Sequence, residues 1–242
     1  MKQVIYRVKS NRQIAPSTFE LLLDGDTSDI KGPGQFVNIK LDGFFLRRPI
    51  SVADRADGEL TLLYKVVGGG TEAMAELAAG AELDVLTGLG NGFDIEKSTD
   101  KPLLIGGGIG CAPLYLLCRE LCRRGIRPQV LLGFNTAEEI YYEEEFRRLT
   151  PHVTVVTADG SRGKAGLVTD ALPDEYEYFY ACGPTPMLRT LADRVKTRGQ
   201  YSLEERMGCG FGACMGCSCK TKNGPKRVCK EGPVMESEEM IW

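Results

Sequence analysis

Short hydrophobic runs, each broken by turn residues, fill about the first 100 residues of this 242-residue chain. Apolar and β-branched residues gather in six stretches that we expect to be strands: residues 4–8, 19–23, 35–40, 49–53, 60–66 and 82–86. Clusters of Gly, Pro, Asp and Asn separate these stretches. Six short strands at this spacing predict a small antiparallel barrel. One short helix is expected to interrupt them, with Thr71 as its N-cap and with Met74, Leu77 and Ala78 turned inward.

From Lys101 the pattern changes to alternating strands and helices. We expect strands at 103–105, 130–134, 153–157 and 178–182, and helices at 112–124, 140–149 and 185–198. In the first helix, apolar residues recur at i, i+3, i+4, i+7 and i+8 from Leu114, and Gly125 closes it. The last helix is expected to begin with Thr185 as N-cap and Pro186 at its first position. Such alternation predicts a Rossmann-like parallel sheet with helices on its faces.

The remaining residues show little periodicity, so we expect metal binding rather than a hydrophobic core to organise them. The chain therefore divides into three predicted parts. These are an antiparallel β-barrel over residues 1–98, an α/β domain over 99–200 and a C-terminal segment over 201–242.

Composition limits the classes of function. At 43% hydrophobic residues the chain can bury a sizeable core, and a net charge of −3 argues against a nucleic-acid partner or an anionic membrane surface. No apolar run approaches the roughly 20 residues of a membrane span. No signal-peptide pattern follows Met1, so the nine cysteines are expected to be free thiols of a cytoplasmic protein.

Four cysteines near the C-terminus carry the clearest chemistry: Cys209, Cys214, Cys217 and Cys229. The first three have the spacing C-x4-C-x2-C, which is the ligand pattern of a plant-type [2Fe–2S] cluster. Structural zinc is the main alternative, but its sites usually consist of C-x2-C pairs. Cys219 lies two residues past Cys217, where an extended segment would point it away, so we expect Cys229 to be the fourth ligand. The other cysteines (Cys111, Cys118, Cys122 and Cys219) are expected to serve in packing.

A glycine run predicts a nicotinamide site. The residues Gly106-Gly107-Gly108-Ile109-Gly110 lie between an expected strand and an expected helix, where glycines permit close approach of a pyrophosphate. The spacing departs from G-x-G-x-x-G, and a tight turn without a ligand is the alternative. A second glycine turn, Cys182-Gly183-Pro184, is expected beside it at the same sheet edge, with the Cys182 thiol near the nicotinamide or simply buried.

Two features of the barrel predict a second nucleotide. Arginines in Arg47-Arg48-Pro49-Ile50-Ser51 offer permanently charged, planar donors for a diphosphate. A glycine run then precedes Thr71 and the short helix. Either feature alone could be surface charge and a turn, but together they suggest a flavin.

These motifs together resemble the ferredoxin-reductase superfamily: RRPIS for the flavin, GGGIGCAP for nicotinamide and CGP at the last strand. The C-terminal stretch CGFGACMGCSC…RVCKEGPVMESEEMIW closely resembles the electron-transfer subunits of NAD-dependent (class 1B) dihydroorotate dehydrogenase. The resemblance covers nearly the whole chain. It implies FAD contacts at Arg48, Pro49, Ile50, Ser51, Leu63, Tyr64, Lys65, Gly70 and Thr71. It supports nicotinamide contacts at Gly107, Gly108, Gly110, Cys182 and Gly183, and cluster ligation by the four cysteines.

Two departures from the family pattern bear on single contacts. Lys65 stands where arginine is expected, which weakens its flavin contact. The eleven residues between Cys217 and Cys229 are fewer than usual, so Cys229 is the least secure ligand.

The resemblance also implies a function. Electrons from dihydroorotate, oxidised on an FMN-bearing catalytic subunit, pass through the [2Fe–2S] cluster and FAD to NAD⁺ in pyrimidine biosynthesis, in a heterotetramer with two copies of each subunit. This chain alone is not expected to oxidise dihydroorotate, and His152 is expected to be a solvated loop residue. NAD is favoured over NADP because no cation follows the second sheet strand, although Arg162 could supply one from a neighbouring loop.

Alternatives stay open at this point. A related subunit of a sulfide dehydrogenase, a ferredoxin:NADP reductase or a hydrogenase diaphorase would share the same motifs, and a zinc-stapled binding protein could use the same fold. The apolar end of the chain suggests either a partner surface or packing onto its own domain: Phe211, Met215, Met235, Met240, Ile241 and Trp242.

Overall fold

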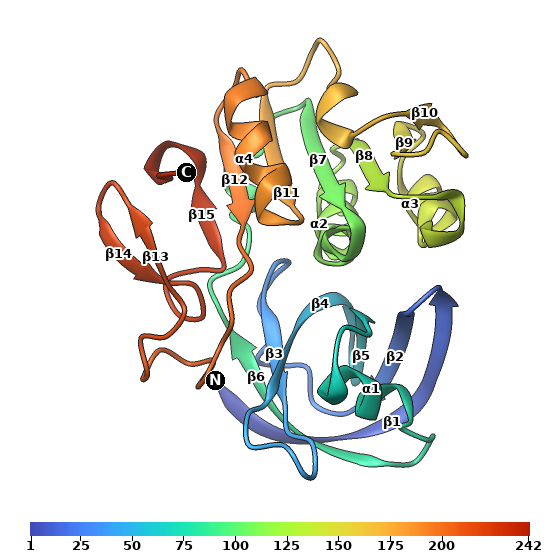
Figure 1. Ribbon diagram of the computed structural model, residues 1–242, viewed down its shortest axis with the longest axis vertical. Helices are drawn as coiled ribbons and strands as arrows, with labels where there is room; N and C mark the ends of the chain where they lie inside the picture. The colour runs from blue at the N-terminus through green and yellow to red at the C-terminus, as the bar shows by residue number, and fades with distance from the viewer.

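The computed structural model describes all 242 residues as a barrel beneath an open α/β sheet, with a cysteine-rich segment at one side (Figure 1). Six antiparallel strands close the barrel in the order β1-β2-β5-β4-β3-β6. Their bounds are β1 Lys2–Ala15, β2 Thr18–Asp24, β3 Phe36–Ile39, β4 Arg48–Ala56, β5 Glu59–Lys65 and β6 Glu82–Leu89. All six expected strands are therefore present, and closure leaves the barrel without open edges.

Strand alternation explains why this part of the chain forms a barrel. In β6 every second side chain is buried, from Leu83 through Val85 and Thr87 to Leu89. The inward residues meet apolar side chains of the other strands, and Tyr6, Leu21 and Leu62 are fully buried there. The period of two in the sequence thus sets which face of each strand is the core.

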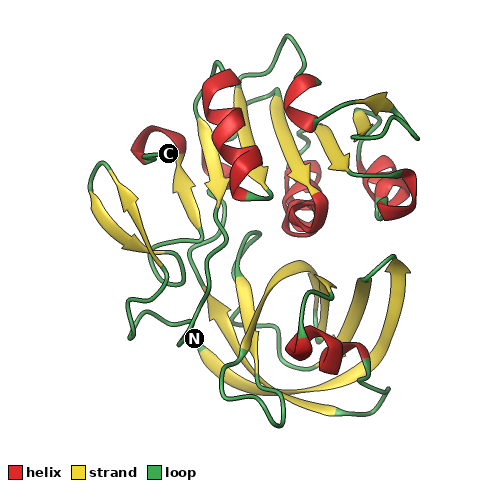
Figure 2. Cartoon of the chain, viewed as in Figure 1, coloured by secondary structure: helices red, strands yellow, loops and turns green.

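The second sheet has seven strands in the order β10-β9-β8-β7-β11-β12-β15. Its strands are β7 Pro102–Gly107, β8 Gln129–Phe134, β9 Val153–Thr157, β10 Lys164–Ala165, β11 Tyr178–Cys182, β12 Gly199–Ser202 and β15 Val234–Glu236. All pairings are parallel except that of β12 with β15. Helices cover both faces (Figure 2), namely α2 Ala112–Arg123 and α3 Glu143–Leu149 on one and α4 Thr185–Arg194 on the other.

Helix α2 joins the barrel to the sheet. It lies between them and packs against β4, with Leu116 buried in the barrel core (Figure 1). An ion pair connects Arg119 to Asp54 on β4, and Arg119 also donates to the carbonyl of Arg55 at 2.7 Å. One helix thereby holds the carboxyl ends of the parallel strands over the barrel.

Three helices have ends that differ from the sequence expectation. Helix α1 spans Gly69–Ala75 with Gly68 as N-cap, so the assignment of Thr71 as cap was wrong, and Ala78 is exposed rather than inward. Helix α3 starts at Glu143 rather than 140, because Tyr142 has a left-handed φ of +60° that no helix can include.

Helix α4 starts after Pro184 as N-cap, so Thr185 is its first residue and not its cap. It ends at Arg194 rather than 198, because Val195 adopts an extended conformation with ψ of 139°. The apolar pattern beyond Arg194 therefore continues into a loop, where Val195 still packs against the core.

Residues 200–242 are more regular than expected. Strand β15 extends the α/β sheet, and Met235 and Met240 are buried in its core while Trp242 packs edge-on against Tyr201. The expectation that no hydrophobic core organises this region was therefore wrong for its last residues. The other apolar residues of this end stay exposed: Phe211, Met215 and Ile241.

Candidate functional site

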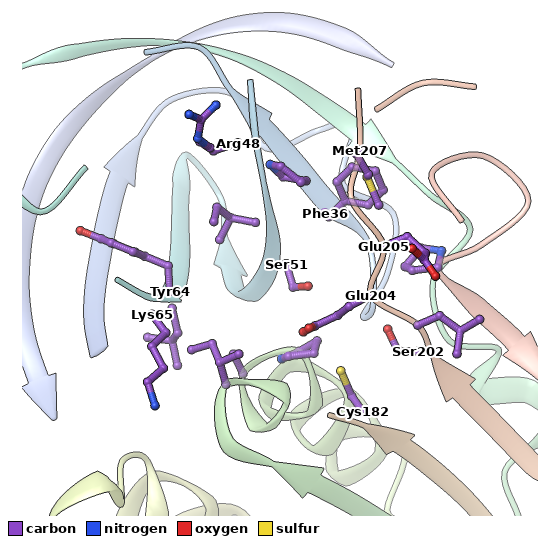
Figure 3. Close-up of a pocket in the computed structure, with 18 of the residues that line it drawn as sticks. Phe36, Arg48, Ser51, Tyr64, Lys65, Cys182, Ser202, Glu204, Glu205 and Met207 are labelled. Carbon is purple, nitrogen blue, oxygen red and sulfur yellow. The ribbon is translucent and has the colours of Figure 1, made fainter. Parts of the chain in front are cut away.

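A cavity of about 370 Å³ lies between the barrel and the carboxyl ends of the sheet strands (Figure 3). Strands β4 and β5 form one wall, and α2 and β11 form the other. Nine of the residues singled out from the sequence line it together: Arg48, Pro49, Ile50, Ser51, Leu63, Tyr64, Lys65, Thr71 and Cys182. The structure therefore brings the expected flavin residues and one expected nicotinamide residue into a single space.

The two arginines of the RRPIS motif have different roles. Arg47 is held by Asp84, whose two carboxylate oxygens each accept from it at 3.0 Å, and it also donates to the Asp84 carbonyl at 2.9 Å. Arg48 lies 4.6 Å above the Phe44 ring and lines the cavity. Arg48 therefore lines this cavity, whereas Arg47 is held by Asp84 and borders only an adjoining cavity.

Beside Arg48 the backbone has room for a phosphate. A Cβ at Gly70 would lie 1.9 Å from Arg48 Nε, so only glycine lets the backbone and guanidinium come together here. Gly70 also borders an adjoining cavity of about 650 Å³, with Arg48 and Thr71. The Thr71 hydroxyl accepts from the N–H of Val67 at 2.9 Å. A permanent cation beside side-chain-free backbone fits the diphosphate of a dinucleotide.

Strand β5 completes the same wall as β4. Tyr64 is 1% exposed, stacks on Phe19 at 5.6 Å and donates its hydroxyl proton to Asn11 at 3.0 Å. Lys65 lines the same cavity, but its ammonium group lies 3.5 Å from the Glu139 carboxylate. Part of the Lys65 charge is therefore neutralised by the protein.

Sequence reasoning missed five residues of this cavity that come from the end of β12 and the chain after it: Ser202, Leu203, Glu204, Glu205 and Met207. In Figure 3 the Glu204 carboxyl points into the cavity between Ser51 and Cys182. Water reaches this side chain through the mouth of the cavity, yet the protein around it raises its pKa above 4.5 by desolvation. No sequence motif predicted that residues 203–207 line the cavity, because only the path of the folded chain brings them to it.

Cys182 ends β11 at the inner wall. It is 2% exposed, and burial is the main cause that raises the pKa of its thiol far above 9.0. The thiol is therefore protonated at neutral pH and acts as an uncharged, small contact surface.

A second cavity, of about 300 Å³, opens at the carboxyl ends of β7, β8 and β11. Gly107 and Gly108, two of the predicted nicotinamide contacts, line it together with Asn135 and Pro184. Gly108 has a φ of +54°, which turns the chain from β7 toward α2. Ligands of open α/β sheets bind at this edge of the strands.

Two further expected residues lie behind these cavities rather than in them. A Cβ at Gly110 would stand 2.4 Å from the Cys182 carbonyl oxygen, and one at Gly183 would stand 2.5 Å from the Met187 methyl group. Both glycines let the two turns pack together. The sequence expectation that the turns are neighbours is confirmed by the pairing of β7 with β11.

The four C-terminal cysteines stand as two pairs beside the barrel. Cys209 Sγ accepts from the N–H groups of Ala213 at 3.2 Å and Cys214 at 3.4 Å. Cys217 and Cys229 are each 2% exposed, and the N–H of Cys229 donates to Cys217 Sγ at 3.4 Å. No three acidic, histidine or cysteine side chains in the chain meet in the geometry of a metal centre.

The donor set nevertheless fits an iron–sulfur cluster. A Cβ at Gly208 or Gly216 would stand 3.3 or 3.6 Å from Cys214 Sγ, so glycines on both sides leave space around that sulfur. Burial opposes ionisation of Cys209, but backbone N–H groups of Cys214 and Phe211 point at its sulfur and lower its pKa to about 6. Such N–H donors stabilise cluster thiolates in the same way.

Cys219 packs against the hydrophobic cluster that contains Cys217 and Cys229. It is on β13 (Ser218–Thr221), which pairs with β14 (Gly224–Arg227) in a hairpin, and burial raises the pKa of its thiol. The hairpin returns the chain so that Cys229 reaches Cys217. The choice of Cys229 over Cys219 as the fourth ligand stays a prediction.

Comparison with known proteins identifies the same NAD-binding and iron–sulfur regions. Residues 104–193 match the oxidoreductase NAD-binding domain, and residues 204–241 match the iron–sulfur cluster binding domain of dihydroorotate dehydrogenase B. A chain of an NADH-dependent reduced ferredoxin-NADP oxidoreductase superposes with a TM-score of 0.87 at 29% identity, over 98% of this chain and 90% of that one. Phthalate dioxygenase reductase has the same fold, with a TM-score of 0.68 at 18% identity over 85% of this chain and 70% of its own.

The fold and the site define a reductase of the ferredoxin-reductase type with an iron–sulfur segment at its C-terminus. The electron transfer subunit of dihydroorotate dehydrogenase B (NAD(+)) from Bacillus caldolyticus is 44% identical, over 97% of this chain and 96% of its own. The same subunit from Fusobacterium nucleatum subsp. nucleatum is 43% identical over 94% of each chain. The chain belongs to this family of electron transfer subunits, and the sequence expectation of fold and family is confirmed.

Proposed function

We propose that this chain passes electrons from the catalytic subunit of a dihydroorotate dehydrogenase, through a [2Fe–2S] cluster and FAD, to NAD⁺. The observation that carries the proposal is its 44% identity, over nearly the full length of both chains, to a subunit of that name. The match of residues 204–241 to the iron–sulfur domain of the same enzyme supports it. The 29% identity to a ferredoxin-NADP oxidoreductase chain is lower, so the related enzymes are not favoured.

The cofactors supply the redox chemistry, because a flavin accepts electrons singly and gives them up as a hydride. The chain binds and orients them. Arg48 and the Gly70 backbone would hold the FAD diphosphate, and β4 and β5 would support its ring through Ser51 and Tyr64. Cys209, Cys214, Cys217 and Cys229 would hold the iron.

The nicotinamide dinucleotide would occupy the second cavity and reach the first across the turn after β11. Gly107 and Gly108 admit its pyrophosphate to the backbone at one side of that turn, and Cys182 lies at the other side in the flavin cavity. The uncharged Cys182 thiol would give the two ligands a small contact surface at this junction.

The preference for NAD over NADP has a structural basis in the arginine that could have served a 2′-phosphate. Arg162 donates to the Glu143 carboxylate at 3.1 Å, and Glu143 also accepts from Arg147 at 2.9 Å. Burial of Glu143 favours its neutral form, but the two arginines outweigh burial and lower its pKa, so the carboxylate stays charged. Arg162 is therefore occupied by the protein.

As an electron transfer subunit the chain requires a catalytic partner. We infer that this partner carries FMN and that the complex is a heterotetramer with two copies of each subunit. No helix of the structure is long and apolar enough to cross a membrane. The nine free cysteines support a reducing compartment, the cytoplasm.

Anaerobic co-purification with the FMN subunit tests the proposal. The complex should reduce NAD⁺ when dihydroorotate is added, whereas neither the FMN subunit nor this chain alone should do so. A complex with dihydroorotate that reduces an artificial acceptor but never NAD⁺ would contradict the proposal, as would co-purification with a hydrogenase or another iron–sulfur partner instead.

A further inference from the structure

Strand β3 carries two different surfaces on its two faces. Val37 and Ile39 are fully buried in the barrel core. Phe36 and Asn38, which alternate with them, face the other way and are also buried, at 3% and 1% exposure. The cysteine-rich segment covers this outer face. Phe36 packs there against Cys217 and Cys229.

Asn38 makes the polar contact of this face. Its Nδ2 donates to the carbonyl of Cys209 at 3.2 Å, across 171 positions of the chain. On the loop side, a Cβ at Gly210 would stand 2.3 Å from the same Nδ2, and Gly210 has a φ of +77°. The loop backbone therefore comes close to the Asn38 amide, and a larger side chain at position 210 would push the loop away from Asn38.

The amide is an unusual choice for this position. Asparagine is disfavoured within strands, and the buried Asn38 Oδ1 has no hydrogen-bond partner. A buried, unpaired acceptor destabilises a fold. A residue that served only to pack the barrel would be apolar, as its neighbours on the strand are.

The other edge of β3 leads directly to the flavin cavity. Asn38 is opposite Pro49 and Phe36 is opposite Ser51 in the pairing with β4, and both β4 residues line that cavity. The Asn38 carbonyl also accepts from Arg47 at 3.3 Å, and Arg47 is fixed by Asp84. Phe36 itself also lines that cavity, so β3 contacts both the cysteine segment and the wall of the proposed flavin cavity.

We propose that Asn38 is a positioning residue. Its hydrogen bond holds the Cys209 end of the iron–sulfur segment against the barrel. It thereby sets the position and the reduction potential of the cluster relative to the flavin. The proposal rests on the function proposed above. The Asn38 side chain contacts the backbone of a ligand residue and not the metal itself. Such outer contacts tune the properties of a metal centre.

The test compares the holoprotein with the variant Asn38→Leu, which keeps the size of the side chain and removes its donor. We expect about tenfold faster hydrogen exchange over residues 206–216, since a buried hydrogen bond that closes this loop is lost. We also expect a shifted midpoint potential and altered g values of the reduced cluster in an EPR-monitored titration. Neither readout depends on turnover.

Thr87→Val is the matched control. Thr87 is fully buried in the same barrel and its hydroxyl also lacks a partner, but no hydrogen bond joins its side chain to the cysteine segment. This control should retain the wild-type exchange, potential and spectrum. Identical behaviour of Asn38→Leu and Thr87→Val would overturn the proposal.

If Asn38→Leu does not fold, Gly210→Ala tests the same contact from the loop side and should shift the same two readouts. A Gly210→Ala protein with wild-type potential and exchange would then overturn the proposal. Failure of the proposed function is distinguishable, because the wild-type protein itself would then lack the EPR signal of a reduced [2Fe–2S] cluster.

Discussion

Glu204 illustrates how a single residue can influence a redox cavity without belonging to a motif. Its carboxyl points between Ser51 and Cys182, and desolvation alone raises its pKa (Figure 3). A neutral carboxylic acid at this place can donate a hydrogen bond, whereas a carboxylate would repel electron density arriving on a bound ring. The charge state of Glu204 is therefore coupled to the occupation of the cavity.

This coupling predicts a pH-dependent stability difference for Glu204→Gln. The folded-state pKa lies above 4.5, so the stability that this group contributes is fully present below pH 4.5 and is lost as pH rises through the folded value. The variant should gain stability over the wild type as pH rises from about 5 to 8. The gain stays below about 1 kcal/mol, because water reaches the side chain. Thermal unfolding of both proteins across this range measures it, and a difference independent of pH would contradict the assignment.

The charge pair between Arg162 and Glu143 predicts a change in coenzyme choice. Glu143→Gln removes the charge that holds Arg162, so the ratio of NADPH to NADH use with an artificial acceptor should rise about fivefold to tenfold, as one charge-assisted hydrogen bond allows. The double variant Glu143→Gln/Arg162→Ala is the control and should lose the gain. An equal ratio in all three proteins would show that Arg162 does not reach the 2′ position.

At the scale of elements, the β13–β14 hairpin decides which thiols can share a cluster. It returns Cys229 to Cys217 and leaves Cys219 on β13. Cys229→Ser should therefore lose most bound iron and acid-labile sulfide, whereas Cys219→Ser should retain both. Iron and sulfide analysis after anaerobic purification distinguishes the two. Retention of a full cluster in Cys229→Ser would mean that another residue is the fourth ligand.

Strand β15 makes the end of the chain part of the sheet core. Met235 is 1% exposed, so Met235→Ala should lower the free energy of unfolding by about 2–4 kcal/mol. Met215, at 53% exposure on the cysteine loop, is the matched control, and Met215→Ala should change stability by less than about 0.5 kcal/mol. Denaturant unfolding of both variants gives the values. Similar losses in both would mean that the exposed loop also stabilises the fold.

The elements also show where sequence reasoning works. Alternation located all six barrel strands and helical periodicity located α2, because one face of each is buried. It misplaced the start of α3, since the left-handed φ of Tyr142 is imposed by packing and not by residue type. It did not detect β15, whose three residues are too few to show a period.

The candidate site divides in the same way. Cysteine spacing and glycine runs are local, so the cysteine segment and the nicotinamide turns were found from sequence. The separate roles of Arg47 and Arg48 depend on Asp84, 37 residues away, and the place of Glu204 depends on the course of the chain after β12. Such features arise only from tertiary structure.

At the scale of the whole molecule, the parts lie in the order that electrons would travel. The cysteine segment covers the outer face of β3, and β4 on its other edge lines the proposed flavin cavity. The turn from Cys182 to Pro184 leads from that cavity to the proposed nicotinamide cavity. The exposed Phe211 and Met215 lie on the cysteine loop. This end of the molecule is therefore the side where we expect the catalytic partner to dock.

EPR spectroscopy of the complex under anaerobic conditions tests this order most directly. Dihydroorotate added to the complex should produce the signal of a reduced [2Fe–2S] cluster, and excess NAD⁺ added afterwards should remove it. A cluster that dithionite reduces but dihydroorotate does not, or a dithionite-treated complex without any signal or acid-labile sulfide, would contradict the account.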